Sequence, residues 1–397
     1  MKPQNQLVSL VKSELERRTS GSSSALVVRS PGRLNVIGEH TDYNDGFVMP
    51  SAIDRAIYIG LSPRLDSEGN LHSIDFQESH SFDVKHPVKS PKAWANYLVG
   101  VVDELKRGGY SIGGFDCVFA GDIPIGAGLS SSAAVEAGLA FALNTAFELQ
   151  IGRTELAAIA QRAENNFVGV KCGIMDQFAS LLSEGSSVLN LDCRSLEYDL
   201  IPFKAPDIRF VLCDTGVKHS LASSEYNLRR QECERAVNVL RQSSSHIESL
   251  RDATFEMLEA HRMELDGTAY KRALYVLEEN ARVESAASAL RSDDFKALGE
   301  LLFMSHAGLR DKFEVSCDEL NTLVDAASEI EAVVGARMMG GGFGGCTLNL
   351  VHEDGLSEFN ERIMLAYDKI GTTPRIYECR LMPGTEILNN QSLRELD

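Results

Sequence analysis

The chain has 397 residues, a length for which two domains are expected, each large enough to bury its own hydrophobic core. It carries 39 Lys and Arg against 57 Asp and Glu, and the net charge of −18 argues against nucleic acid or an anionic membrane surface as a partner. The eight cysteines include no C-x-x-C pair, so neither a zinc site nor a disulfide framework is indicated.

The N-terminal segment predicts an amphipathic helix and no signal peptide, because apolar residues recur at helical spacing between residues 7 and 15 with charges between them. The longest apolar run, residues 131–147, is interrupted by Glu136. It falls short of the roughly 18 uninterrupted apolar residues that a membrane span requires. Together with the cysteine usage, this predicts a soluble, cytoplasmic protein.

The first half of the chain, residues 1–200, predicts a mixed α/β domain in which strands and helices alternate. The expected strands are 25–29, 34–38, 56–61, 115–120 and 187–192, and the expected helices are 95–106, 131–147 and 154–165.

The second half, residues 201–397, predicts a helix-rich α+β domain, and the boundary near residue 200 is set only by a turn-rich connection between two strands. The expected helices are 223–241, 270–291, 294–309, 316–329 and 356–369, and the expected strands are 208–213, 346–351 and 375–380.

A dense group of hydrogen-bonding side chains follows the first predicted strands. Glu39, His40 and Asp42 crowd into four residues between two glycines. Carboxylates beside a buried strand can accept hydrogen bonds from several hydroxyls and a histidine can add a donor, which suits a polyol or a sugar. A polar hairpin loop that caps itself, with residues 44–46 as the turn, is the alternative.

A second stretch, residues 121–134, combines a glycine turn with the start of a helix. Gly126 and Gly128 let backbone amides approach a ligand, and the helix that begins among the serines ending at Ser132 adds partial positive charge, so the stretch suits phosphate. The lysine of a Walker loop and the G-x-S-x-G of a serine elbow are both absent. The alternative is a Gly/Ser turn that caps a core helix.

A third, glycine-rich run at residues 340–345 contains a formal G-x-G-x-x-G. It leads into a predicted strand, whereas a dinucleotide site requires a helix there, so the fingerprint is a weak signal. The backbone must nevertheless pass very close to another group at this run.

A fourth stretch, residues 163–177, places two acids around a Cys-Gly turn. Glu164 ends a helix-like run, and Asp176 follows the turn among apolar residues. A shielded carboxylate requires partners, so Asp176 either caps a helix or accepts a proton.

Taken together, these stretches resemble the GHMP kinase superfamily and, within it, the galactokinase family. Residues 33–44 look like the sugar signature, residues 124–133 like the ATP loop and residues 340–345 like the third superfamily motif. Leu34 and Val36 stand where valine and leucine are usual. The match covers nearly the whole chain, because it extends through residues 94–97, 172–177, 219–226 and 309–317.

The resemblance implies a two-domain α/β fold in which ATP and sugar meet at the cleft between the domains. It also implies a reaction of galactose catabolism, in which MgATP phosphorylates the C1 hydroxyl of α-D-galactose. Carried over by motif position, the sugar-binding residues are Glu39, His40, Asp42, Gly173, Asp176 and Tyr226. The ATP-binding residues are Trp94, Gly126, Ala127, Gly128, Leu129, Ser130, Ser131 and Ser132, the Mg²⁺ ligands are Ser132 and Glu164, and the catalytic pair is Arg33 and Asp176.

In that resemblance Arg33 and Asp176 flank the C1 hydroxyl. Phosphoryl transfer depends on positioning and on neutralising the charge of the γ-phosphoryl group. Because the P-loop lysine is absent, Mg²⁺, the helix end and Arg33 are expected to neutralise that charge. Asp176 is expected to orient and deprotonate the hydroxyl, although an aspartate with an ordinary pKa of about 3.9 is a weak base at neutral pH. Whether proton removal precedes or follows transfer is left open by the sequence.

Two alternatives remain open at this point. The signature acids read hydroxyls that N-acetylgalactosamine and L-arabinose share with galactose, so a kinase for a related sugar is one alternative. A galactose sensor without turnover is the other, and the uninterrupted serine run at residues 129–134 favours an enzyme over it. The expected partners are galactose and MgATP, with no nucleic acid or membrane, and the expected oligomeric state is a monomer.

Overall fold

The structure is a computed structural model that describes residues 3–19, 25–124, 126–218, 222–368 and 374–388. Within these ranges the strands form a six-stranded, a four-stranded and a three-stranded sheet. Neighbouring strands of the six-stranded sheet are antiparallel except β4 and β6, which are parallel. Its strand order is β13 (Glu386–Ile387), β1 (Leu26–Asn35), β3 (Pro50–Pro63), β6 (Phe115–Gly121), β4 (Glu68–Ser73) and β5 (Glu78–Asp83).

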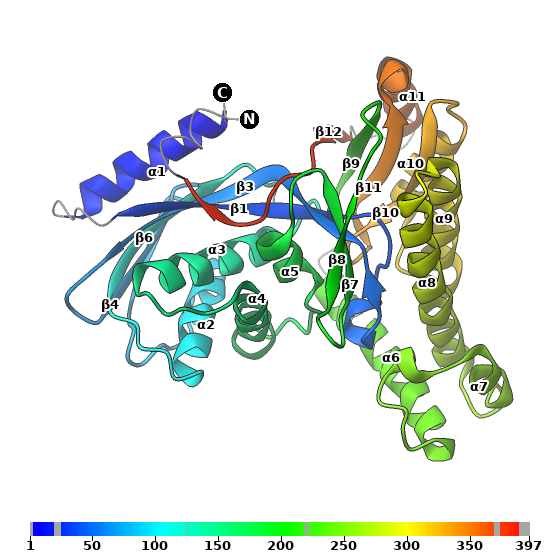
Figure 1. The fold of residues 1–397 in the computed structure, drawn as a ribbon, viewed down its shortest axis with the longest axis horizontal. Coiled ribbons are helices and arrows are strands. Elements are labelled where there is room, and N and C mark those ends of the chain that lie inside the picture. Colours follow the sequence, from blue (N-terminus) through cyan, green and yellow to red (C-terminus); the bar gives the residue numbers. More distant parts are fainter. Residues whose placement is uncertain (1–2, 20–24, 125, 219–221, 369–373, 389–397) are drawn as a thin grey trace.

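Different helices cover the two faces of the six-stranded sheet (Figure 1). Successive side chains of a strand point to opposite faces, and accordingly Val27 joins the apolar cluster beneath α1 whereas Val28 joins the large central core. One face carries α1 (Gln4–Arg18). The other carries α2 (Ala93–Arg107), α3 (Ser131–Ala146), α4 (Arg153–Arg162) and α5 (Met175–Leu182).

The second half of the chain is built on the antiparallel four-stranded sheet, against which α9 and α10 pack. Its strands, in order, are β10 (Val333–Met339), β11 (Gly344–His352), β9 (Ile208–Lys218) and β12 (Arg375–Cys379). Its helices are α6 (Ala222–Ser243), α7 (Phe255–Ala260), α8 (Gly267–Arg291), α9 (Phe295–Gly308), α10 (Asp318–Ser328) and α11 (Leu356–Asp368). The long helices α8 and α9 lie side by side (Figure 1).

The small three-stranded sheet and the short helical turns connect these parts. The sheet consists of β2 (Phe47–Val48), β7 (Ser187–Asp192) and β8 (Tyr198–Pro202). The turns are η1 (Asp42–Asn44), η2 (Ala163–Val168), η3 (Leu250–Asp252), η4 (Leu309–Phe313) and η5 (Glu353–Gly355).

The predicted mixed α/β class is confirmed, but the prediction of two separate strands at residues 25–29 and 34–38 is wrong. One strand, β1, runs without a break from Leu26 to Asn35, and its pairing with β3 shifts register between Pro31 and Arg33. A β-bulge inserts an extra residue and redirects the side chains that follow it. The Pro-Gly pair therefore bends the strand at this point without ending it.

The division into two domains near residue 200 stays a prediction. The strands of the four-stranded sheet all follow residue 207, yet the C-terminal strand β13 returns to pair with β1 of the first sheet. One continuous apolar core also includes Val28 of β1, Val283 of α8 and Leu348 of β11. In the part of the chain that is described, no helix has the length and apolar character needed to cross a bilayer.

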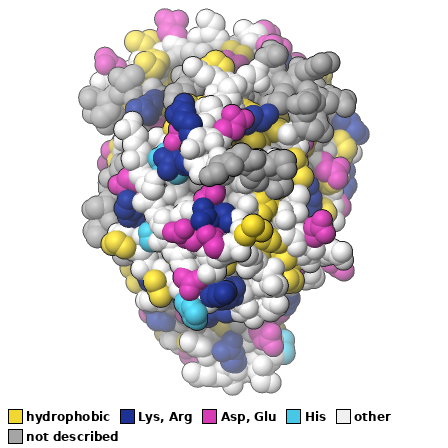
Figure 2. Space-filling model, turned by 90° about the vertical axis from the view of Figure 1, so that its left-hand side faces the viewer, with side chains coloured by type: hydrophobic (Ala, Val, Ile, Leu, Met, Phe, Trp, Pro, Cys, Tyr) yellow, Lys and Arg dark blue, Asp and Glu magenta, His cyan; other side chains and the backbone are white. Residues whose placement is uncertain are grey.

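Figure 2 shows the face of the molecule that lies on the left-hand side of Figure 1. Lys and Arg side chains stand there among Asp and Glu side chains. Ion pairs of the first sheet have the same mixed character, as Arg64 pairs with Asp66, Glu68 and Asp116. The carboxylates of Asp66 and Glu68 are exposed, and exposed pairs contribute little to stability.

The contact between α9 and β10 leads to a test of the packing. An ideal Cβ built on Gly299 would lie 1.8 Å from the Val334 carbonyl oxygen, so Gly299→Ala should force the helix away from the strand. Overpacking of this kind typically costs about 1–3 kcal/mol, which urea denaturation would measure as a lower midpoint. In the control Gly267→Ala, no atom lies within 4 Å of the new Cβ, and the midpoint should not fall. Equal midpoints for the two variants would contradict this account of the contact.

Candidate functional site

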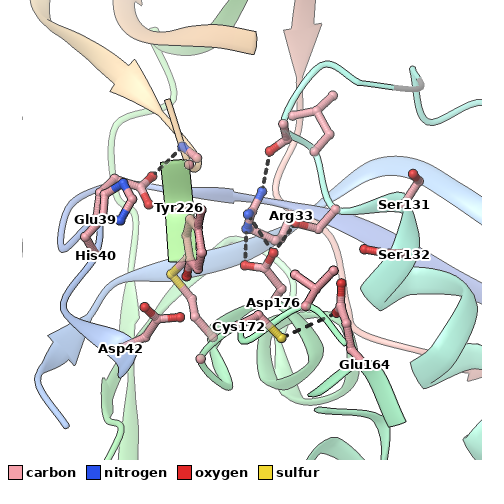
Figure 3. Close-up of a pocket in the computed structure, with 18 of the residues that line it drawn as sticks. Arg33, Glu39, His40, Asp42, Ser131, Ser132, Glu164, Cys172, Asp176 and Tyr226 are labelled. Atoms are coloured by element: carbon pink, nitrogen blue, oxygen red, sulfur yellow. Dashed lines mark hydrogen bonds and ion pairs between the residues drawn. The ribbon is translucent and has the colours of Figure 1, made fainter. Parts of the chain in front are cut away.

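A cavity of about 330 Å³ opens where the segment after β1, the start of α3, the turn before α5, helix α6 and the turn between β10 and β11 meet (Figure 3). Most of the residues predicted from the four sequence stretches line this one cavity. They are Arg33, Glu39, His40, Asp42, Gly126, Gly128, Leu129, Ser130, Ser131, Ser132, Glu164, Gly173, Asp176 and Tyr226.

Two of the predicted residues do not line the cavity. Ala127 is fully buried beneath the loop. Trp94 lies on α2, where its Nε1 donates to Glu78 at 2.8 Å and its ring stacks on Phe76 with 6.4 Å between centroids. The role predicted for Trp94 stays a prediction.

Six lining residues were not among those predicted. Gly340 and Gly341 belong to the glycine run, whose density of glycines was itself the signal for a close backbone approach. An ideal Cβ on Gly340 would lie 3.5 Å from the Gly128 carbonyl oxygen, and one on Gly341 would lie 3.3 Å from the Tyr226 ring. The others are Pro124, Val170, Cys172 and Met175, for which the sequence holds no signal beyond their neighbours.

Arg33 owes its position to the bulge in β1. An ideal Cβ on Gly32 would lie 2.7 Å from the Leu129 carbonyl oxygen, so β1 and the serine loop can approach this closely only with glycine there. The Arg33 guanidinium donates from Nη1 to the Gly128 carbonyl at 2.6 Å. Burial lowers the pKa of Arg33, but the charges of Asp176 and Glu39 outweigh burial and raise it, so the side chain is a permanent cation.

Asp176 receives three hydrogen bonds in the described structure. Arg33 donates Nε to Oδ1 at 2.7 Å and Nη2 to Oδ2 at 2.8 Å, and the Ser130 hydroxyl donates to Oδ2 (Figure 3). Asp176 lies in the first turn of α5, where the helix dipole favours a negative charge. This bidentate pair holds the carboxylate at the point where the sugar signature and the serine loop meet.

Glu39 is held by groups from the second half of the chain. Its Oε1 accepts from Arg337 Nη2 at 2.7 Å and from the Gly340 backbone N–H at 2.9 Å. Its backbone carbonyl accepts from the Tyr275 hydroxyl at 3.0 Å. Arg337 is fully buried and was not predicted as a site residue, although it begins the glycine-rich stretch.

His40 presents a neutral imidazole to the cavity. Burial, followed by the charge of Arg229, lowers the pKa of His40 to about 3. Its Nδ1 shares a 2.8 Å hydrogen bond with the Tyr43 hydroxyl, and its Nε2 is buried without a hydrogen-bond partner among the described residues. That nitrogen is therefore available to a ligand.

Asp42 packs directly against the Cys-Gly turn. An ideal Cβ on Gly173 would lie 2.1 Å from Asp42 Oδ2, so only glycine leaves room for the carboxylate. Burial, and then the like charges of Asp176 and Glu39, raise the pKa of Asp42 to about 7. A ligand whose hydroxyls donate to Asp42 would stabilise its ionised form.

A second group of acids lies behind the serine loop. Gln177 donates to Glu164 at 2.8 Å and to Glu136 at 3.3 Å, and all three side chains are buried. Burial and the charge of Asp176 raise the pKa of Glu164, and burial and Glu164 raise that of Glu136. Over the residues that the structure describes, no three His, Cys, Asp or Glu side chains form a metal site on their own.

The serine loop brings a helix end to the cavity. Gly126 and Gly128 have φ of 83° and 73°, which favours glycine, and Ser130 also has a positive φ, 58°. Helix α3 starts at Ser131, and the Ser131 and Ser132 side chains border the cavity. The unpaired amides and partial positive charge of the helix N-terminus suit a phosphate at this point.

Three protein-family models match parts of the chain. Residues 16–63 match the galactokinase galactose-binding signature. Residues 96–184 match the GHMP kinases N terminal domain, and residues 286–363 match the GHMP kinases C terminal domain. These matches include Arg33, the serine loop and Asp176 of the cavity, and also Arg337, which binds Glu39.

Named relatives are similar over nearly the whole chain. A galactokinase of Roseiflexus sp. (strain RS-1) is 42% identical over 93% of this chain and 95% of its own length. A galactokinase of Thermotoga maritima is 41% identical over 86% of this chain and 94% of its own. The crystal structure of Lactococcus lactis galactokinase complexed with galactose superposes with a TM-score of 0.92 at 35% identity, over 96% of this chain and 99% of that one.

A more distant solved structure shares the fold. Methanococcus jannaschii mevalonate kinase superposes with a TM-score of 0.62 at 19% identity, over 92% of this chain and all of that one. The family models and the galactokinase structure confirm the predicted GHMP kinase fold.

The electrostatics around Asp42 can be tested by removing one neighbouring charge. Glu39→Gln takes away one of the two like charges that raise the pKa of Asp42, so this pKa should fall below about 7. Carboxyl ¹³C NMR of the protein labelled at aspartate would follow it. Glu104→Gln is the control, because Glu104 is equally buried but bonds to Arg162 and Asn166 outside the cavity. An Asp42 pKa that is the same in both variants would contradict the assignment.

Proposed function

The chain belongs to the galactokinase family of the GHMP kinases, and from this premise we propose that its cavity transfers the γ-phosphoryl group of ATP to the C1 hydroxyl of α-D-galactose. One observation supports this most directly. The side chains of the sugar signature and the serine loop face the same cavity, and the Arg33–Asp176 ion pair lies between them (Figure 3).

The sugar occupies the side of the cavity formed by the signature. Glu39 and Asp42 accept hydrogen bonds from its hydroxyls, and the neutral His40 contributes the ring nitrogen that has no protein partner. Gly173 leaves the space that Asp42 requires, and the Tyr226 ring closes this side. When the sugar binds, its hydroxyls donate to the Asp42 carboxylate and offset the repulsion from Asp176 and Glu39.

The nucleotide occupies the side formed by residues 126–132. Backbone amides of the loop and the start of α3 hold the phosphates. Ala127 is buried within the loop and supports it. Trp94, which is half-buried on α2, would approach the adenine.

Mg²⁺ would accompany the nucleotide, and Glu164 and Ser132 would hold it. Burial and then the charge of Asp176 raise the pKa of Glu164, and a bound cation would offset both effects while Gln177 donates to the carboxylate. Mg²⁺ in kinases commonly rests on one or two protein groups together with the phosphates, so a complete protein cage is not required. When bound, the ion neutralises charge on the phosphates.

Asp176 orients the C1 hydroxyl and accepts its proton, and Arg33 stabilises the charge that develops during transfer. The Ser130 hydroxyl that now donates to Asp176 shows that a third donor fits beside the two from Arg33. The sugar hydroxyl takes such a donor position. Because Arg33 is a permanent cation that already contacts both Asp176 and the Gly128 carbonyl of the serine loop, it needs no rearrangement to meet that charge.

The proposal is tested by coupled ADP release with MgATP and galactose, N-acetylgalactosamine, L-arabinose, glucose or mevalonate as acceptor. Galactose should give the highest kcat/KM. A clear preference for another sugar would mean that this sugar, and not galactose, is the substrate. Galactose binding without ADP release would indicate a sensor in place of an enzyme.

Asp176→Asn should lower kcat by about 10²-fold or more while galactose still binds, because the amide keeps the shape but not the basicity of the carboxylate. Steady-state kinetics and calorimetric titration with galactose would separate the two effects. Asp116→Asn is the control, since Asp116 also pairs with an arginine, Arg64, but lies outside the cavity. Turnover at the wild-type rate in the Asp176 variant would reject its role as base.

A further inference from the structure

We infer that Arg337 is a positioning residue for the sugar, which acts by holding the Glu39 carboxylate in the orientation that accepts a sugar hydroxyl. The inference rests on the proposed function of the cavity. Arg337 does not line the cavity itself, and neither the resemblance to kinases nor the arrangement of the four stretches gave it a role.

Arg337 reaches from β10 to the segment that follows β1. Its Nε donates to the Val36 carbonyl at 2.8 Å, and its Nη2 donates to the Asn35 carbonyl at 2.8 Å and to Glu39 Oε1 at 2.7 Å. One guanidinium therefore fixes both the backbone that enters the signature and the side chain four residues further on. The fork geometry of arginine makes this possible, whereas a lysine offers a single point of charge.

The pair between Arg337 and Glu39 is shielded from water. The Arg337 side chain is 0% exposed and that of Glu39 is 3% exposed. The Gly340 N–H donates to the same Oε1 atom at 2.9 Å, so this oxygen is committed to the protein. With one oxygen held in this way, the carboxylate presents its other oxygen in a fixed direction.

Loss of the guanidinium would leave Glu39 with the Gly340 N–H as its remaining donor at that oxygen among the described contacts. A carboxylate that loses a buried partner turns toward other donors or toward water. The sugar hydroxyl that binds Glu39 would then lose its acceptor. The other signature side chains, His40 and Asp42, would keep their contacts with the sugar. The expected defect is therefore selective for one hydroxyl of the sugar.

The test compares Arg337→Met, Arg337→Lys and Glu39→Gln in calorimetric titrations with galactose and with each of its monodeoxy derivatives, in the absence of nucleotide. Wild type should bind the deoxy sugar that lacks the hydroxyl bound by Glu39 more weakly than it binds galactose. Glu39→Gln identifies this sugar, because in that variant the difference in affinity between it and galactose disappears. Arg337→Met should bind galactose at least tenfold more weakly and lose the same discrimination. Its KM for galactose should rise more than its kcat falls.

Arg272→Met is the matched control. Arg272 is 2% exposed and donates to Glu232 at 2.7 Å, so its loss breaks a similarly buried pair. The hydrogen bonds of Arg272 go to Glu232, Lys312 and Glu314 and do not hold Glu39. This variant should keep the wild-type pattern of deoxy-sugar affinities. A double variant of Arg337 and Glu39 should show little further loss beyond Glu39→Gln, since both changes remove the same contact.

The outcomes separate the inference from the function on which it rests. Wild type that neither binds nor phosphorylates galactose rejects both. Suppose instead that wild type binds and phosphorylates galactose. The inference alone is rejected if Arg337→Met or Arg337→Lys lowers the affinity for all deoxy sugars equally, or lowers it for none. If neither variant of Arg337 folds, the residue acts through stability and the inference is likewise rejected.

Discussion

The bidentate ion pair between Arg33 and Asp176 joins a strand of the first sheet to the first turn of α5. Two bonds and a helix dipole fix the carboxylate, while the bulge in β1 brings the guanidinium beside the serine loop. The Arg33 side chain is only 5% exposed, and a buried charge is costly unless its hydrogen bonds are satisfied. The Gly128 carbonyl accepts a further bond from Arg33, and the Ser130 hydroxyl donates a further bond to Asp176. The geometry of the cavity follows from these contacts.

The sugar signature depends on the second half of the chain for its shape. Glu279 of α8 accepts from the Gly38 N–H at 3.0 Å, and Asn280 accepts from the Phe47 N–H at 3.0 Å. Tyr275 binds the Glu39 carbonyl between these two points, and Arg337 binds the Val36 carbonyl just before them. A loop that is polar and rich in turns is thereby held as firmly as core structure, which is what a site for a small, hydroxyl-rich ligand requires.

The sequence predicted most long helices and strands because their apolar periodicity is strong, and it predicted most of the residues around the cavity. It could not show that β1 continues through Pro31-Gly32, because a bulge depends on pairing with β3. The hairpin of β4 and β5 and the return of β13 were also missed, since their pairing partners lie far away in sequence or carry few apolar residues. The roles of Arg337 and Gln177 depend on long-range contacts that no local pattern reveals.

The central claim is that the ion pair meets the anomeric hydroxyl of galactose, and the position of the phosphate on the product tests it most directly. In ³¹P–¹H correlation NMR of the sugar product formed from galactose and MgATP, the phosphorus should couple to the anomeric proton of an α-configured sugar. A phosphate coupled to a proton at any other carbon, or no sugar phosphate at all, would contradict the account.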